Sequence, residues 1–205
     1  TQLQPLAALV EEPVVLVTAS SGPETLAALR ALGERGLIGT PASGSAAHVA
    51  SLRFDGRLDL PRLAFPSAAA ARQAAIAGNV AAAVLGLADA IAALREGKLT
   101  PMGLAAARRS TLLPDTPTLR ELGVEVVAAT IRGFTLPPSA PDPWRAALLA
   151  AMEGVAADPD FGAQCAALGQ TPRFLDPEAW NRLLARVDAD LRRRWHEDPW
   201  LPRPA

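Results

Sequence analysis

Cysteine is nearly absent from this 205-residue chain, and other residue types that carry chemistry are scarce. Cys165 is the only cysteine, so the chain can form no intramolecular disulfide and no cysteine-based zinc or iron–sulfur site. Tyrosine does not occur, and there are only two histidines. We therefore expect the protein to work without a metal or another cofactor.

An excess of charge and long apolar runs are also lacking. The net charge is -1, with half of the residues hydrophobic and a fifth charged, as in ordinary soluble globular proteins. Without a basic field the chain has nothing to attract nucleic acid. Apolar runs such as Val80–Ala88 are too short to span a bilayer. The first residues contain no signal peptide, as expected of a mature exported protein or of a cytosolic one.

Apolar runs of strand length alternate with helical patterns in the first half of the chain. The pattern predicts strands at Pro13–Val17, Leu37–Gly39, Leu63–Phe65, Val80–Leu85 and Thr100–Ala105. Helices are predicted to open at Pro23, near Ser45 and at Ala68, and a fourth helix ends at Arg95. This alternation is typical of βαβ units, and the continuous apolar strands suit a mostly parallel sheet with helices on both faces.

The last third of the chain has a different character. Val124–Leu136 is predicted to be extended, with a break at Gly133. Three Asp-Pro pairs then predict helices, each with aspartate as N-cap and proline at the first position. These N-caps are Asp142, Asp158 and Asp176. The sequence thus predicts a β/α part followed by a helical part. Thr1–Glu12 and Gly133–Ala140 are the natural places for the chain to pass between two lobes.

The best candidate for binding chemistry is a small-residue loop between a strand and a helix. Backbone N–H groups at a helix start have no partner within the helix, and they can bind a carboxylate without a charged side chain. Glycines let the ligand come close, and hydroxyls add donors. The simpler alternative, which the residues alone favour, is a turn with a serine cap. The candidate residues are Gly39, Thr40, Ser43, Gly44 and Ser45.

His48 lies about one turn into the same predicted helix, three residues after Ser45. A serine–histidine pair on one helical face would suggest a hydrolase. However, no carboxylate is placed to orient the histidine, and the flanking pattern is not that of a nucleophile elbow. We therefore expect His48 to bond or pack against a neighbouring loop. A serine hydrolase remains the least favoured of the functions considered for this chain.

Several motifs, taken in order, resemble one family. Gly39–His48 resembles its G-S-A-G-x-G-S-x-x-H loop, and Glu96–Leu99 resembles its A-G-K-L segment. Arg109–Gly123 resembles R-S-x-x-L-P-D-V-P-T-x-x-E-x-G, the most specific of the series. Together these motifs resemble the receptors of tripartite tricarboxylate transporters, also called Bug proteins. They are spread, in the family's order and spacing, over nearly the whole chain.

The resemblance implies an α/β fold of the periplasmic-binding-protein type II class. Residues 18–128 would form a complete lobe, and residues 1–17 and 129–205 would supply crossover segments and C-terminal helices of an incomplete first lobe. It implies a periplasmic, non-enzymatic protein that binds a small carboxylate between two lobes and delivers it to membrane permease subunits. Family members have a long N-terminal section with a glycine-rich loop. We expect this chain to lack that section, either as a fragment or as a shortened relative.

The resemblance adds further candidate positions. Phe65–Ser67 aligns with the family's P-Y-K-G loop, so Pro66 and Ser67 are candidate ligand residues, with a plain N-cap at Ser67 as the alternative. Arg132 could pair with a carboxylate in two-pronged fashion, or it could be a surface arginine on an exposed strand. Ala81 and Leu85 stand where the family usually has aspartates.

These departures keep a second function open. A shortened family member could act as a protein-interaction or sensor module that binds no solute. An apolar surface left bare by the missing section would then favour self-association, so a homo-oligomer is a further expectation.

Overall fold

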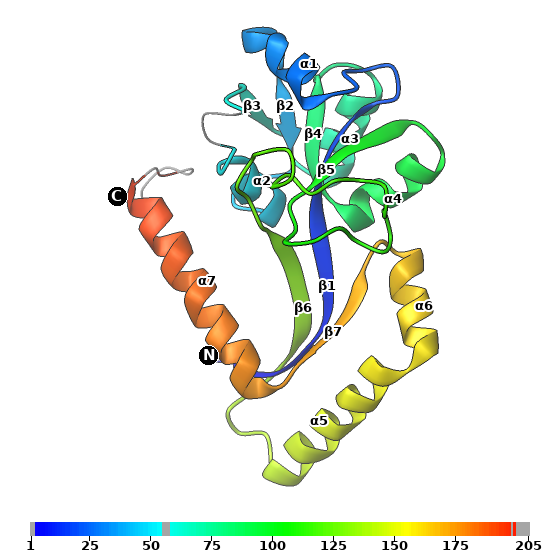
Figure 1. The fold of residues 1–205 in the computed structure, drawn as a ribbon. Coiled ribbons are helices and arrows are strands. Elements are labelled where there is room, and N and C mark those ends of the chain that lie inside the picture. Colours follow the sequence, from blue (N-terminus) through cyan, green and yellow to red (C-terminus); the bar gives the residue numbers. More distant parts are fainter. Residues whose placement is uncertain (1–2, 55–57, 198, 200–205) are drawn as a thin grey trace. The chain divides into compact units, whose positions relative to one another are not determined.

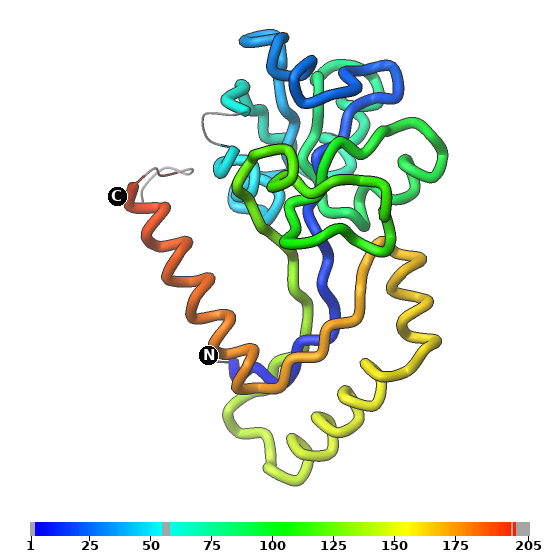
Figure 2. The backbone as a smooth tube through the Cα atoms, in the orientation of Figure 1, coloured from blue at the N-terminus to red at the C-terminus, as the bar shows by residue number. Residues whose placement is uncertain are grey.

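The computed structural model describes residues 3–54, 58–197 and 199, and its chain forms two compact units. Unit 1 consists of Thr1–Glu11 and Ile131–Ala205, and unit 2 of Glu12–Thr130. The chain passes between them within strand β1 (Gln4–Ala19) and near the start of strand β6 (Ala129–Leu136), as Figure 2 traces. The sequence predicts boundaries after residues 17 and 128, whereas the structure places residues 12–17 and 129–130 in unit 2 as well.

Unit 2 is built on a mixed sheet with strand order β3-β2-β4-β1-β5 (Figure 1). Its other strands are β2 (Ile38–Thr40), β3 (Arg62–Ala64), β4 (Ala82–Gly86) and β5 (Leu99–Leu104). Strand β2 runs parallel to β3 and β4, whereas β1 runs antiparallel to its neighbours β4 and β5. The predicted mostly parallel sheet is therefore confirmed, with one antiparallel strand in its interior.

Helices cover both faces of this sheet, as predicted. The helices of unit 2 are α1 (Leu26–Ala31), η1 (Gly33–Arg35), α2 (Ala46–Ser51), α3 (Ala68–Ile76) and α4 (Leu87–Arg95). Side chains of β1 alternate between two apolar clusters, because successive residues of a strand point to opposite faces. Val14 and Leu16 join the cluster that includes α1 and α2, while Val15 and Val17 join the cluster that includes α3 and α4.

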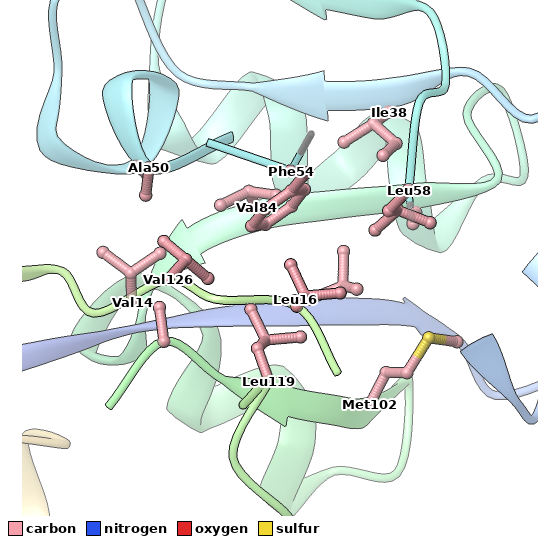
Figure 3. Close-up of a cluster of buried hydrophobic side chains, with 14 of the residues drawn as sticks. Val14, Leu16, Ile38, Ala50, Phe54, Leu58, Val84, Met102, Leu119 and Val126 are labelled. Carbon is pink, nitrogen blue, oxygen red and sulfur yellow. The ribbon is translucent and has the colours of Figure 1, made fainter. Parts of the chain in front are cut away.

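Phe54 lies in the first cluster and is the largest fully buried side chain among the described residues. It lies three residues after the end of α2 and beside Val84 of β4 in Figure 3. The cluster continues across β1 to Leu119 and Val126, which belong to the segment after β5. This packing fixes α2, and therefore the loop before it, to the sheet.

Unit 1 is formed by the first half of β1, by most of β6 and by the C-terminal part of the chain. Strand β7 (Thr171–Leu175) pairs antiparallel with β1, and Arg173 forms an ion pair with Glu11. The helices are α5 (Asp142–Ala157), α6 (Pro159–Ala167) and α7 (Pro177–Glu197). None of the 16 residues of α5, all of them described, is buried. In the described part of the chain no helix is both long and apolar enough to cross a membrane.

Two predicted helix starts are wrong. The first helix begins at Leu26 and not at Pro23, because the Thr25 hydroxyl accepts the Ala28 N–H and caps the helix there. In α5 the N-cap is Pro141, and Asp142 is already the first helical residue.

The other two aspartate caps are confirmed. Asp158 accepts the Asp160 N–H at 2.8 Å, and Asp176 accepts the Ala179 N–H at 2.8 Å. An aspartate one residue before a proline is thus a reliable start signal at these two sites, where the carboxylate is free to turn back to the helix.

Three extended segments also differ from prediction. The break expected at Gly133 is absent, since β6 runs through it. Strand β7 was not predicted, because Pro172 argues against a strand interior. Strand β1 starts at Gln4, well before the predicted Pro13, because Leu6–Leu9 is buried in unit 1 and part of it pairs with β7.

Candidate functional site

The two candidate loops of unit 2 follow neighbouring parallel strands at the same edge of the sheet. Strand β2 ends at Thr40 and β3 at Ala64, and these two residues are register partners. The Phe65 N–H donates to the Thr40 carbonyl at 2.8 Å, which joins the second loop to the end of β2. The structure therefore brings loop 41–45 and loop 65–67 together at the carboxyl ends of the strands, where open α/β sheets bind ligands.

Loop 41–45 is pinned to the first turn of α2. The Ser45 N–H donates to the Ala42 carbonyl at 3.0 Å, and the Ser45 hydroxyl accepts the His48 N–H at 3.2 Å. Gly44 has a φ of 85°, in the region that glycine adopts readily, and its N–H donates to His48 Nδ1 at 3.3 Å. These bonds confirm the expected serine cap and the expected contact between His48 and a neighbouring loop.

The outer part of this loop presents hydrogen-bond donors to solvent. Ala42, Ser43 and Gly44 are exposed. Within the described residues, the N–H groups of Ala42, Ser43 and Ala46 have no acceptor. Helix α2 has only six residues, so its dipole is small and the individual donors matter more. The loop can therefore hold an anion chiefly through direct hydrogen bonds from its backbone and hydroxyls.

Gly39 and Thr40 lie beneath the loop and not on its exposed surface. Thr40 is fully buried, and its hydroxyl donates to the Pro41 carbonyl at 3.1 Å. A Cβ atom at Gly39 would lie 3.1 Å from the Phe65 ring and 3.3 Å from Val80. The missing side chain at Gly39 thus lets Phe65 pack closely, and the Thr40 hydroxyl has an intramolecular partner.

Pro66 and Ser67 are exposed in the second loop. The Ser67 hydroxyl accepts the Ala70 N–H at 3.2 Å and caps α3, as the N-cap prediction expects. A capping hydroxyl uses a lone pair and keeps its own proton for donation. Ser45 and Ser67 can therefore cap their helices and still donate to a bound anion.

The remaining predicted positions lie elsewhere. Arg132 is exposed on β6 in unit 1, so unit 2 assembles its two loops without this residue. Leu85, in place of a family aspartate, is fully buried in the second apolar cluster.

A cavity of about 470 Å³ lies at the opposite edge of the sheet, near the amino ends of β2 and β3. It is lined by Gly33, Glu34, Asp59, Leu60, Pro61 and Arg62. Residues 38 and 62 begin the two strands whose carboxyl ends carry the candidate loops, so this cavity and the loops are separate features. Among the described residues no cluster of three or more His, Cys, Asp or Glu side chains could hold a metal ion.

His48 supports the loop from a buried position. Burial lowers the pKa of the imidazole, and the positive charge of Arg62 lowers this pKa further. Only 7% of the surface of His48 is exposed, and Nδ1 can accept the Gly44 N–H only when that nitrogen carries no proton. The neutral ring therefore stabilises the conformation of loop 41–45.

We expect the stability of the protein to depend on His48 below pH 6.5. Because the folded pKa is below the unfolded value, the unfolded chain binds the proton more readily, and stability falls as the pH drops from about 6.5 toward the folded pKa. In His48→Asn a side-chain oxygen can replace Nδ1 without titrating. Between pH 7.5 and 5 the melting temperature of the wild type should fall by at least about 2 °C more than that of the variant. Melting temperatures that fall equally with pH in wild type and variant would contradict a role for His48 protonation.

Sequence reasoning missed one charged residue at the carboxyl edge of the sheet. Glu12 falls within a predicted crossover segment, yet only 1% of its surface is exposed. Nothing in the sequence separates Glu12 from Glu11, whose side chain is about one third exposed. Its burial follows from the pairing of β1 with β4, whose partner residues are some 70 positions apart in the chain.

Comparison with known proteins gives one family and a consistent fold. The model of the tripartite tricarboxylate transporter family receptor matches residues 1–194. A search of curated proteins finds no match. Solved structures match over nearly the whole chain while about two thirds of their own length is covered.

Three of these structures illustrate the likeness. An R. palustris protein with adipate has a TM-score of 0.83 at 19% identity, covering 96% of this chain and 68% of that one. MatC from Rhodopseudomonas palustris with bound malate has a TM-score of 0.71 at 26% identity, covering 95% and 69%. A TctC solute binding protein from Polaromonas, with no ligand, has a TM-score of 0.73 at 21% identity, covering 91% and 67%.

Proposed function

Because the chain belongs to the tripartite tricarboxylate transporter receptor family, we propose that it is an extracytoplasmic solute-binding protein that captures a small organic carboxylate for uptake. The observation that carries the proposal is the pair of adjoining loops at the carboxyl ends of β2 and β3, which expose uncharged hydrogen-bond donors. The adipate and malate in the two R. palustris structures are ligands of the proposed class.

Recognition would be non-covalent. The free N–H groups of Ala42, Ser43 and Ala46 and the hydroxyls of Ser43, Ser45 and Ser67 would donate to a carboxylate, directly or through water. Gly39, Thr40 and Pro66 would shape the floor and rim of the site. Closure of two lobes would then enclose the ligand, with unit 2 (Glu12–Thr130) as one complete lobe and unit 1 as part of the other. Arg132 would supply a charged contact from the second lobe.

The remaining parts of the proposal follow from the family. The receptor would work in the periplasm and hand its ligand to membrane permease subunits of the transporter. Ligand capture needs no covalent step, so we assign no enzymatic activity. Self-association stays a prediction without support from the receptors compared, and sedimentation of the purified chain would test it.

Binding can be tested by titration calorimetry with malate, adipate and uncharged adipamide. We expect heat from one or both carboxylates and none from adipamide. Gly44→Ala should weaken binding at least tenfold, because a side chain at a φ of 85° strains the loop and turns its donors away.

Gly97→Ala is a matched control for this variant. Gly97 also has positive φ (67°), but it follows α4 and precedes β5, away from the two loops. This variant should lose stability and keep its affinity. The absence of binding heat with every carboxylate, or equal weakening by the two variants, would contradict the proposed function.

A further inference from the structure

The start of α4 is capped from a distant part of the chain. The register of β1 and β4 pairs Val14 with Gly86, which brings Glu12 level with Ala88. The Ala88 N–H donates to Glu12 Oε1 at 3.1 Å, and the Glu12 side chain is almost wholly buried. Gly86 is the N-cap of α4 and has no side chain to offer. A carboxylate 76 positions upstream of Ala88 therefore takes the place of a local cap.

Gly86 is what makes room for this carboxylate. A Cβ atom at residue 86 would lie well inside 3.0 Å of Glu12 Oε1, closer than real Cβ atoms come to other atoms. The same Cβ position lies 3.4 Å from the carboxylate of Asp89, in the first turn of α4. Two carboxylates thus gather at the start of α4, where the helix dipole and the free N–H groups favour negative charge.

This arrangement sets α4 apart from the other helices at the same edge. Helices α2 and α3 begin with the neutral caps Ser45 and Ser67, which belong to the candidate loops. Strand β4 lies next to β2 and parallel to it, so α4 also starts at the carboxyl edge of the sheet. A ligand held by loops 41–45 and 65–67 would therefore have the start of α4 as its third neighbour in unit 2.

We propose that Glu12 is a built-in anion that fills the start of α4 and keeps ligand carboxylates away from this side of the site. An external carboxylate approaching α4 finds the Ala88 N–H already engaged and the space beside Gly86 filled by the Glu12 carboxylate. Unit 2 then accepts one carboxylate, at the two loops, and favours ligands whose next group is uncharged, such as a hydroxyl. The consequence for ligands rests on the proposed function, whereas the role of Glu12 at α4 does not.

The Ala88 amide signal in ¹H–¹⁵N spectra reports on the start of α4 directly. Glu12→Ala should leave this N–H without its partner and open space for a small anion. On titration with acetate, against chloride at equal ionic strength, the Ala88 signal of this variant should shift and saturate. Wild type and the matched control Glu12→Gln, whose amide oxygen keeps the N–H occupied, should show less than a third of that shift. An unresponsive Ala88 signal in folded Glu12→Ala, or an equal shift in wild type, would overturn the proposal.

Glu12→Gln also tests the proposal if Glu12→Ala does not fold. Removing the charge while keeping the shape should raise the ratio of malonate affinity to acetate affinity at least threefold, because the second carboxylate of malonate meets less repulsion. An unchanged ratio would overturn the proposal. If wild type binds neither probe at Ser43 and Gly44, the proposed function fails, while saturable acetate binding at Ala88 in Glu12→Ala would still uphold the role of Glu12.

Discussion

Replacing Gly133 by alanine should destabilise the protein by about 3 kcal/mol, the upper end of the usual cost of overpacking. A Cβ atom at this position would lie 2.6 Å from Ala8 Cα and 2.8 Å from the ring of Trp180, and closer still to the Ala7 carbonyl oxygen. Two of these neighbours are backbone atoms of β1, so no change of rotamer relieves the clash. The free energy of unfolding from urea titrations would measure the loss.

Gly154→Ala is the matched control, since it makes the same substitution in the same unit. Gly154 lies within the exposed helix α5, and a Cβ atom there would have no neighbour within 4 Å. Alanine should stabilise the helix by roughly 0.5–1 kcal/mol. If the two variants changed stability equally, the close packing of β6 on β1 would be contradicted.

Replacing Phe54 by alanine should cost about 3–5 kcal/mol, the range for emptying a buried phenylalanine site. Phe54 is fully buried between α2 and the sheet of unit 2, so the substitution leaves a cavity and loosens the support of loop 41–45 (Figure 3). The expected result is a large drop in the urea midpoint, read from a fluorescence or circular dichroism titration.

Phe134→Ala removes the same side chain from a site that is 54% exposed. Its cost should stay below about 1 kcal/mol, because little apolar surface returns to water. A loss of similar size in both variants would show that Phe54 does not anchor the core.

The strands of unit 2 could be predicted because local signals and tertiary packing agree there. Val80–Leu85 is apolar on both faces, which suits a strand between two helical layers, and the structure buries Ala82–Gly86 completely. Strand β7 could not be predicted, since its proline contradicts local propensity and only pairing with β1 makes it a strand. The break predicted at Gly133 is wrong, because the sequence does not distinguish a glycine needed for close packing from a glycine needed for a bend in the chain.

The candidate site, like the fold, could be predicted from the sequence only in part. Small residues and serine caps predict the two loops, because both signals lie within a few residues of each other in the sequence. The burial of Thr40 depends on its strand position, which leaves the hydroxyl inside. Glu12 was out of reach of sequence reasoning, because no local signal distinguishes it from Glu11 and its bonding partner Ala88 is 76 residues away.

The most direct test of carboxylate recognition is to map which backbone amides respond when the ¹⁵N-labelled chain is titrated with malate. This readout detects weak binding and identifies the donors. Saturable shifts are expected at Ala42 and Ser43, which are exposed in the first loop, and at Ala46 and Ala68, the first residues of α2 and α3. No saturable shift at these amides, or shifts confined to residues such as Gly33 and Asp59 around the cavity at the opposite edge, would contradict carboxylate recognition by the two loops.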